Sequence, residues 1–469
     1  MKSSNFVRNL MYAFGAQAIS LALSLLMALV VPKLLGIEDY SFWQLFIFYC
    51  GYSGILHFGL IDGVYLKYGG KKFTDLDFSL MGSQFFLFTG FQIIIALMII
   101  ITAKEYIFEV DRLYVVYGTL AYMIIYNASA FLGYIFQAVN ETNKYSLSVM
   151  VDRIFFIIIV IVAMLNKNLD FEFFINFYIL SKALALIYCL YVGKDILLAR
   201  KRFNIAVLKE MLDNITIGSK LLIANIAGAL ILGVGRLVID NVWGVTTFGR
   251  FSFALSLTNF FLLFISQVSM VLFPALRQID KEQLKFLYID MRRGLSIFLP
   301  VIFILYIPIK LVLEIWLPKY QDSLEYMALL LPLCIFDGKM QMLCNTYFKV
   351  LRKESLLLLI NVITFVCSLL LCSFGAYVLH DIQSVIVFMV IAIALRSIFS
   401  EVYLANLMQL SIFKEVGLEI IIITIFILSA LYLNDFYTLG IMFFSYLVYL
   451  LLNKAAVIEI TSKVKKLLN

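Results

Sequence analysis

The sequence predicts an all-α membrane protein with about 14 transmembrane helices. The first observation is composition: 63% of the 469 residues are hydrophobic and only 14% are charged, whereas soluble domains contain about 25% charged residues. The second is the pattern, because long apolar runs follow one another with only short polar breaks. A run of about 18 or more apolar residues is typical of a membrane-spanning helix. A transmembrane β-barrel would instead show alternating segments of about ten residues.

The predicted spans follow one another from the N-terminus to near the end of the chain. The first apolar run is longer than a signal-peptide core and lacks a small-residue cleavage site, so we expect a retained helix. The approximate limits of the spans are 9–34, 41–66, 78–102, 114–139, 147–165, 173–192, 219–239, 251–273, 295–313, 324–344, 356–379, 385–407, 416–433 and 438–453.

The distribution of Lys and Arg predicts the orientation of these spans. With the N-terminus inside, the bases in cytoplasmic segments far outnumber those in outer segments, as the positive-inside rule requires. We therefore expect a multi-pass protein of the cell inner (cytoplasmic) membrane with both termini cytoplasmic. The bases lie in scattered short loops, so the net charge of +7 does not indicate nucleic-acid binding.

Two pairs of similar segments predict an internal duplication. The polar turn at 31–43 aligns with 240–251, placing Gly36 on Gly244, and the end of span four aligns with the end of span ten. Two six-helix units with even span numbers would be parallel repeats. The predicted domains are an N-lobe at 1–193, a cytoplasmic amphipathic linker at 194–218, a C-lobe at 219–408, and two further helices with a cytoplasmic tail at 409–469.

Several charges fall inside the predicted spans, where each costs roughly 2.5–3.5 kcal/mol near the bilayer centre. One interpretation is a central cationic cleft that holds an anionic ligand, since Arg binds phosphate bidentately. The other is internal pairing, either of Arg236 with Asp240 or of Arg396 with Glu401 or Asp337. Asp152 and Arg153 are interpreted as a solvated helix end, and His57 as a hydrogen-bonded core residue. The deep cations are Lys182, Arg236, Lys339 and Arg396, and the carboxylates considered for ion coupling or pairing are Asp62, Asp240, Asp337 and Glu401.

No pattern in the sequence indicates an enzyme. There is no Gly-rich phosphate loop, and the six Cys fall inside apolar runs without metal-ligand spacing. With two His in the chain, a histidine-based metal site is not expected. We expect transport without a cofactor, and leave open whether a coupling ion, H⁺ or Na⁺, drives it.

Several short segments are similar to a known family. Residues 32–43 (PKLLGIEDYSFW) and 58–69 (FGLIDGVYLKYG) resemble the first hairpin of O-antigen and polysaccharide flippases of the Wzx type. These flippases belong to the multidrug/oligosaccharidyl-lipid/polysaccharide exporter superfamily. Residues 137–140 (QAVN) are similar to the end of the family's fourth span, and 240–249 (DNVWGVTTFG) to its span seven–eight turn.

The resemblance implies a V-shaped pair of six-helix lobes that open alternately to each side of the membrane. The implied substrate is an undecaprenyl-pyrophosphate-linked oligosaccharide, moved to the outer leaflet for O-antigen or capsule synthesis, with Lys33 and Arg250 as further ligand candidates. Membrane lipid and other polysaccharide-assembly proteins are the implied partners. The alternatives are a drug/cation antiporter of the same superfamily and a membrane-embedded transferase or polymerase.

Overall fold

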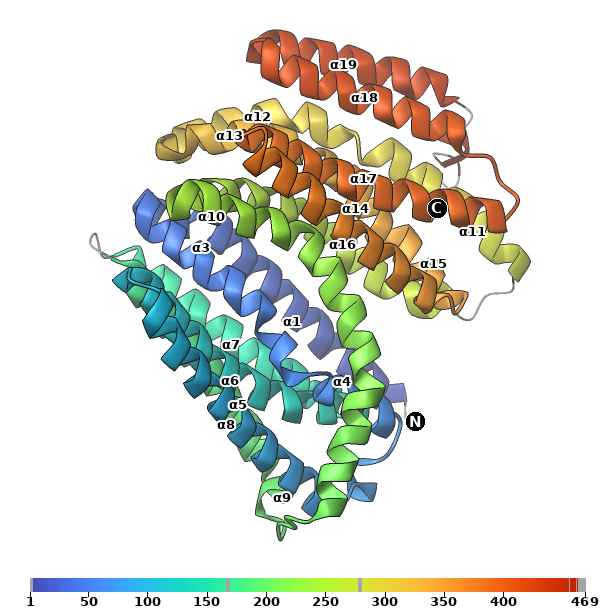
Figure 1. The fold of residues 1–469 in the computed structure, drawn as a ribbon. Helices are drawn as coiled ribbons and strands as arrows, with labels where there is room; N and C mark the ends of the chain where they lie inside the picture. Colours follow the sequence, from blue (N-terminus) through green and yellow to red (C-terminus); the bar gives the residue numbers. More distant parts are fainter. Residues whose placement is uncertain (1–2, 166–168, 277–280, 455, 461, 463–469) are drawn as a thin grey trace. The chain divides into compact units, whose positions relative to one another are not determined.

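The fold was analysed in a computed structural model that describes residues 3–165, 169–276, 281–454, 456–460 and 462. Within these ranges the chain is helical and contains no strand (Figure 1). It forms two compact units, Met1–Ile226 and Ala227–Asn469. The all-α fold class predicted from the sequence is therefore confirmed.

Unit 1 is built around one long central helix, α6 (Val110–Ala138), which packs against α3, α4, α5, α7 and α8. The fully buried Trp43 of α3 stacks on Phe156 and meets the edge of Tyr178, which joins α3 to α7 and α8. The other elements of unit 1 are α1 (Ser3–Leu29), α2 (Val31–Leu34), α3 (Ile37–Tyr52), η1 (Ser53–His57), α4 (Leu60–Tyr68), η2 (Phe73–Asp75), α5 (Phe78–Tyr106), α7 (Thr142–Ala163), α8 (Phe171–Val192) and α9 (Lys194–Leu198).

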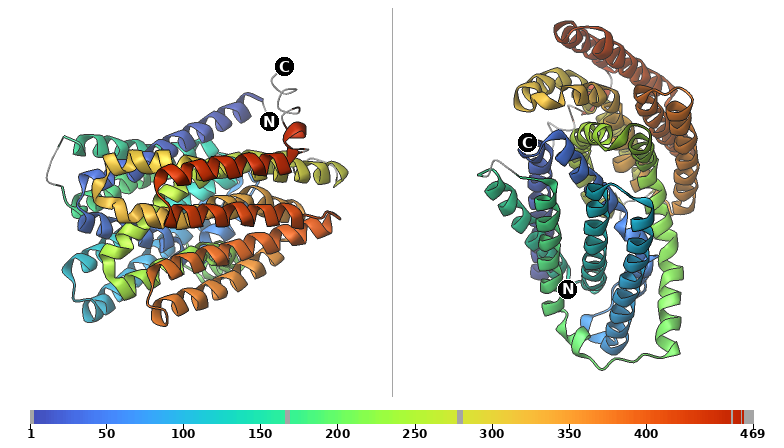
Figure 2. Two further views of the ribbon diagram at one scale, coloured as in Figure 1. Left: turned by 90° about the horizontal axis from the view of Figure 1, so that it is seen from above. Right: turned by 60° about the vertical axis from the view of Figure 1, so that its left-hand side comes forward.

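Unit 2 contains the remainder of α10 and every later helix. Its most extensive helix pair is α16 with α17, whose orange ribbons lie side by side in Figure 2. The short helix α14 also packs on α17. Its elements are α10 (Ile205–Leu276, beginning in unit 1), α11 (Lys281–Phe298), α12 (Val301–Trp316), η3 (Pro318–Tyr320), α13 (Gln321–Leu330), α14 (Pro332–Lys339), η4 (Met340–Cys344), α15 (Asn345–Val350), α16 (Glu354–Tyr377), α17 (Ile382–Leu407), α18 (Phe413–Tyr432) and α19 (Asp435–Leu452).

Short polar residues start several of these helices. The Asp77 carboxylate accepts a hydrogen bond from the Leu80 N–H at 3.1 Å, and Asp170 caps α8 in the same way. Asp381 caps α17 through the N–H groups of Gln383 and Ser384. These bonds satisfy N–H groups that a helix leaves without partners. Burial alone would raise the pKa of Asp381, but the bonds from the Ser384 hydroxyl and from the two N–H groups favour the charged carboxylate and hold the pKa below its usual value.

Within the described residues, 11 helices are long and apolar enough to span a membrane, or up to 13 if each of two bent pairs is one span. One candidate, Ile205–Leu263, covers 59 residues and is interrupted at Gly244, where φ is 80° and ψ is 175°. That interruption lies in the turn expected between the seventh and eighth spans. The total of 14 and the two-repeat layout stay predictions.

The two bent pairs have identifiable backbone causes. A 60° bend separates Ile37–His57 from Leu60–Tyr68, where Phe58 and Gly59 both have positive φ. A 45° bend separates Pro318–Leu330 from Pro332–Val350, because Pro332 has no N–H to donate and its ring crowds the preceding turn. The predicted spans 41–66 and 324–344 therefore correspond to broken helices.

The predicted linker at 194–218 is divided among several elements. Residues 194–198 form α9, and residues from Ile205 onward are the first turns of α10, continuous with the predicted seventh span. These turns pack on α4: Glu210 accepts hydrogen bonds from Lys67 at 2.8 Å and from the Tyr68 hydroxyl at 2.7 Å. Residues 205–218 thus form part of unit 1.

The crossing of α4 and α10 depends on glycine. A Cβ atom at Gly63 would lie 1.8 Å from the Asn214 carbonyl oxygen, and one at Gly218 would lie 1.9 Å from the Gly59 carbonyl oxygen. Both distances are impossible for real atoms, so the two backbones touch directly. Close approach of this kind is typical of small residues at helix contacts in membranes.

Gly63→Leu should therefore destabilise unit 1 by at least about 1–3 kcal/mol, the usual cost of overpacking. The measurement is the thermal unfolding midpoint of the purified protein in detergent. Gly90→Ala is the matched control, because a Cβ atom there meets nothing within 4 Å and alanine favours the helix. Equal midpoints for the two variants would contradict the close crossing.

Candidate functional site: the buried charges of the two units

The deep cation of unit 1, Lys182, is paired. Its Nζ lies 2.5 Å from Oδ2 of Asp152, and Ser181 Oγ donates to Oδ1 of the same carboxylate at 2.8 Å. Arg153 Nε lies 3.7 Å from Asp152 Oδ2, and the Tyr126 ring is 5.6 Å from Lys182 Nζ. The side chains come from α6, α7 and α8, so the pair lies inside the packed part of unit 1.

The interpretation of Asp152 and Arg153 as a solvated helix end is wrong. Asp152 is 1% exposed, because it lies at the middle of α7 (Thr142–Ala163), which packs against α8. The two pairing residues are 30 positions apart on different helices, so no local spacing in the sequence indicated them.

Asp62 lies beside the bend of unit 1. It is buried in the first turn of α4, and its Oδ2 is 3.8 Å from Nε2 of His57. His57 Nδ1 accepts a hydrogen bond from the Gly59 N–H at 3.0 Å. The structure thus supports the prediction that His57 is a hydrogen-bonded residue, and it places Asp62 next to the break between η1 and α4.

In unit 2, Arg396 has only a long contact to its carboxylate. Nη1 of Arg396 lies 3.5 Å from Oδ1 of Asp337, while Oδ2 of Asp337 accepts a shorter 2.6 Å bond from Gln341. Nε of Arg396 is buried and has no partner among the described residues. Of the pairings considered from the sequence, the structure therefore shows Arg396 with Asp337.

Lys339 is enclosed by two carboxylates. Its Nζ lies 2.9 Å from Oε2 of Glu401 and also donates to Oε2 of Glu419. Glu401 accepts a second bond from Arg292, and Glu419 accepts one from Ser296 at 2.6 Å. Lys339, Glu401 and Glu419 are each at most 1% exposed, so these groups form a buried ionic cluster that joins α11, α14, α17 and α18.

Two members of this cluster were missed by the sequence prediction. Arg292 and Glu419 are not among the candidate residues named from the sequence. A signal was present for Glu419, because it lies inside the predicted span 416–433, where a carboxylate is costly without a partner.

The remaining candidates lie near the turn after the predicted seventh span. Arg236 donates to Ser252 Oγ at 3.0 Å and lies over the ring of Phe248 at 5.0 Å; Asp240 is buried. Arg250 pairs with Asp322 at 2.5 Å at a partly exposed position. The ion pair between Arg236 and Asp240 stays a prediction. In unit 1, Lys33 is exposed in the last turn of α2.

Metal chemistry finds no support in the part of the chain that the structure describes. No group of three or more His, Cys, Asp or Glu residues there is placed to hold a metal ion. The cysteines are all free thiols, and only Cys367 is more than slightly accessible. The deep charges of the described residues thus include closely paired cations, Lys182 and Lys339, and one, Arg396, whose carboxylate contact is 3.5 Å long.

Comparison with solved structures identifies the class of fold. The lipid II flippase MurJ in an inward closed conformation matches with a TM-score of 0.65 and 14% identity, over 96% of this chain and 100% of that chain. A multidrug resistance MATE family transporter of the MOP superfamily, inward-facing, matches with a TM-score of 0.58 and 14% identity, over 84% and 98%. A MATE in complex with MaL6 gives 0.54 and 13%, over 86% and 96%. The fold is thus the one shared by MATE transporters and MurJ.

The family comparison agrees with this fold. Residues 67–280 match the family model described as polysaccharide biosynthesis protein, whereas no curated protein sequence matches significantly. Together the two findings confirm the predicted resemblance to polysaccharide flippases of the superfamily. The chain is thus similar in fold to MATE transporters and MurJ, and its described helices include 11 that are long and apolar enough to cross a membrane.

Proposed function

We propose that this protein moves undecaprenyl-pyrophosphate-linked oligosaccharide units from the inner to the outer leaflet of the cytoplasmic membrane by alternating access. The observation that carries the proposal is a polysaccharide-biosynthesis family match on a fold whose relatives include a lipid II flippase. The polymer would be an O-antigen or capsule-type polysaccharide, and both termini would be cytoplasmic. Other polysaccharide-assembly proteins would supply the substrate and use the product.

The cations differ in how completely they are paired with carboxylates. In this proposal, a less completely paired cation is the better phosphate ligand. An arginine binds a phosphate through two parallel N–H···O bonds, and Arg396 has an unpartnered Nε and one 3.5 Å carboxylate contact. To bind the substrate, Lys182 would have to give up its ion pair with Asp152. Lys339 is held between Glu401 and Glu419, so it anchors α18 in this account. Arg236, Arg250 and Lys33 complete the proposed set of cations.

The carboxylates would couple transport to an ion gradient, H⁺ or Na⁺. Asp62 is the strongest candidate, because it is buried beside the break at Phe58 and Gly59, and its carboxylate lies 3.8 Å from Nε2 of His57. Protonation or cation binding there would remove a buried negative charge at the point where the helix direction changes. Asp240, Asp337 and Glu401 are the other carboxylates of the proposal.

Arg396→Gln should reduce polymer export at least tenfold while the amount of protein in the membrane stays unchanged. The reason is that glutamine keeps a polar side chain of similar length but loses the charge and the fork. Export is measured as surface polysaccharide in a strain in which this protein is the only flippase for that polymer. Arg112→Gln is the matched control, because Arg112 forms a surface ion pair with Glu109, which is worth at most about 1 kcal/mol. Normal export by the Arg396→Gln variant would show that Arg396 does not bind the substrate during transport.

A drug/cation antiporter is the second candidate, favoured by the MATE matches. Those matches cover less of the chain than MurJ does, 84% and 86% against 96%. An antiporter would confer resistance to lipophilic cations on a sensitive host. The proposed flippase should confer none, and resistance without polymer export would favour the second candidate.

A further inference from the structure

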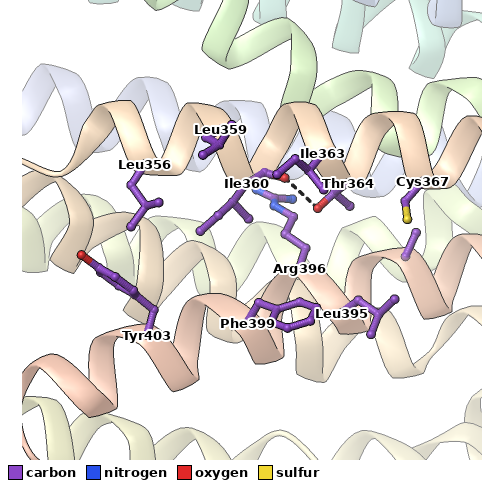
Figure 3. Close-up of a pocket in the computed structure, with 11 residues that line it drawn as sticks. Leu356, Leu359, Ile360, Ile363, Thr364, Cys367, Leu395, Arg396, Phe399 and Tyr403 are labelled. Atoms are coloured by element: carbon purple, nitrogen blue, oxygen red, sulfur yellow. Dashed lines mark hydrogen bonds between the residues drawn. The ribbon is translucent and has the colours of Figure 1, made fainter.

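An open groove runs along unit 2 between α16 and α17. It has a volume of about 420 Å³, within the range of ligand sites. Six residues on one face of α16, from Leu356 to Cys367, form one wall, and five residues of α17 from Ala392 to Tyr403 form the other (Figure 3). Eleven residues of helix correspond to a length of roughly 16 Å, so the groove is long and narrow.

The walls of the groove are apolar and its floor carries a cation. Leu359, Ile363 and Phe399 are each more than half exposed, whereas Arg396 is 8% exposed. Figure 3 shows the Arg396 side chain extending from α17 toward α16 at the level of Ile360 and Thr364. A ligand in the groove would therefore meet hydrocarbon along its length and one guanidinium near the middle.

The Arg396 cation cannot reach water along its own helix. It lies 14 residues from the start of α17 and 11 from its end, which corresponds to roughly 21 Å and 16 Å. Side chains that snorkel to the interface lie near helix ends. The charge must be compensated where it is, and the single Asp337 contact at 3.5 Å leaves Nε without a partner in the described ranges.

The geometry of the guanidinium fits a phosphate. Asp337 contacts Nη1, and the opposite edge, formed by Nη2 and the buried Nε, has the geometry for two parallel bonds to an oxyanion once the side chain is uncovered. Thr364 adds a hydroxyl beside it, which now donates to the Ile360 carbonyl at 2.8 Å. A ligand with a hydrocarbon chain next to a phosphate would match both the apolar walls of the groove and the Arg396 guanidinium at its floor.

We propose that the groove between α16 and α17 binds a polyprenyl pyrophosphate, with the chain along the groove and a phosphate on the Nε–Nη2 edge of Arg396. The identity of the lipid rests on the proposed function, but the binding site does not. The groove would hold the lipid part of the substrate within unit 2 alone.

Cys367 makes the groove testable without added labels. It lines the groove and is partly exposed, whereas the five other cysteines are buried. The experiment measures the rate at which N-ethylmaleimide modifies Cys367 in the full protein in neutral-lipid nanodiscs, with geranylgeranyl pyrophosphate or geranylgeraniol added. We expect the pyrophosphate to slow modification at least tenfold, at concentrations at least tenfold lower than the alcohol requires.

Variants separate the charge from the apolar walls. Arg396→Gln should abolish the difference between pyrophosphate and alcohol. Ile363→Trp should fill the groove and weaken protection by both, whereas Leu370→Trp, an exposed position on α16 outside the groove, should leave protection unchanged. Ile363→Trp tests the groove even if Arg396→Gln fails to fold.

Three results would overturn the assignment: no protection, equal protection by pyrophosphate and alcohol, or equal protection by phosphatidylglycerol, which would indicate a resident phospholipid. If the protein flips lipid-linked oligosaccharide but the pyrophosphate does not protect Cys367, the binding site in the groove is refuted and the proposed function stands. Protection without flipping would support the groove and refute the proposed function.

Discussion

Lys339→Met should lower the free energy of unfolding by about 3–5 kcal/mol, the cost of leaving a buried charge without its partner. The variant removes the cation that Glu401 and Glu419 share and leaves Glu419 with only the Ser296 hydroxyl among the contacts described for it. The measurement is the thermal unfolding midpoint in detergent, together with the amount of protein inserted in the membrane.

The control for this prediction removes an acid together with the base. In Lys339→Met/Glu419→Leu the charges of Glu401 and Arg292 still compensate each other, so most of the lost stability should return. Replacing a buried ion pair by apolar residues is often neutral or stabilising. A double variant as unstable as Lys339→Met would contradict the ionic cluster.

The second large effect is expected at Asp152. Asp152→Leu should also cost about 3–5 kcal/mol, because Lys182 and Arg153 would lose the carboxylate between them. Asp152→Leu/Lys182→Met removes the closer pair and should recover most of the midpoint. The same unfolding measurement checks both variants.

The double variant also tests the proposed ligand role of Lys182. If Lys182 contacts the pyrophosphate by exchanging Asp152 for it, Asp152→Leu/Lys182→Met should fold and reach the membrane but export at least tenfold less polymer. Normal export by the folded double variant would limit this pair to a structural role.

The positions of the helices could be predicted because hydropathy alone identifies apolar runs. The described helices contain most of the predicted runs: 173–192 lies within α8, and α16 contains residues 356–377 of the predicted run 356–379. The 45° bend before Pro332 had a visible cause in the sequence. The 60° bend after His57 did not, since Phe58 adopts a positive φ that few non-glycine residues take.

The pairing of the charges could be predicted only in part. The sequence identified Lys182, Lys339 and Arg396 as deep cations because each interrupts an apolar run. It did not pair Lys182 with Asp152 or Lys339 with Glu419, because those partners come from other helices 30 and 80 residues away. Contacts of this kind depend on packing between helices, for which a single sequence has no periodic signal.

The most direct test of the central claim is lipid flipping by the purified protein in liposomes. A fluorescent undecaprenyl-pyrophosphate-linked oligosaccharide is placed in both leaflets, and dithionite is added outside to quench the outer pool. Wild-type protein should make the inner pool accessible to dithionite, and Arg396→Gln should slow this at least tenfold. An inner pool that stays protected with wild-type protein, in liposomes where an imposed H⁺ or Na⁺ gradient is also supplied, would contradict the proposed function.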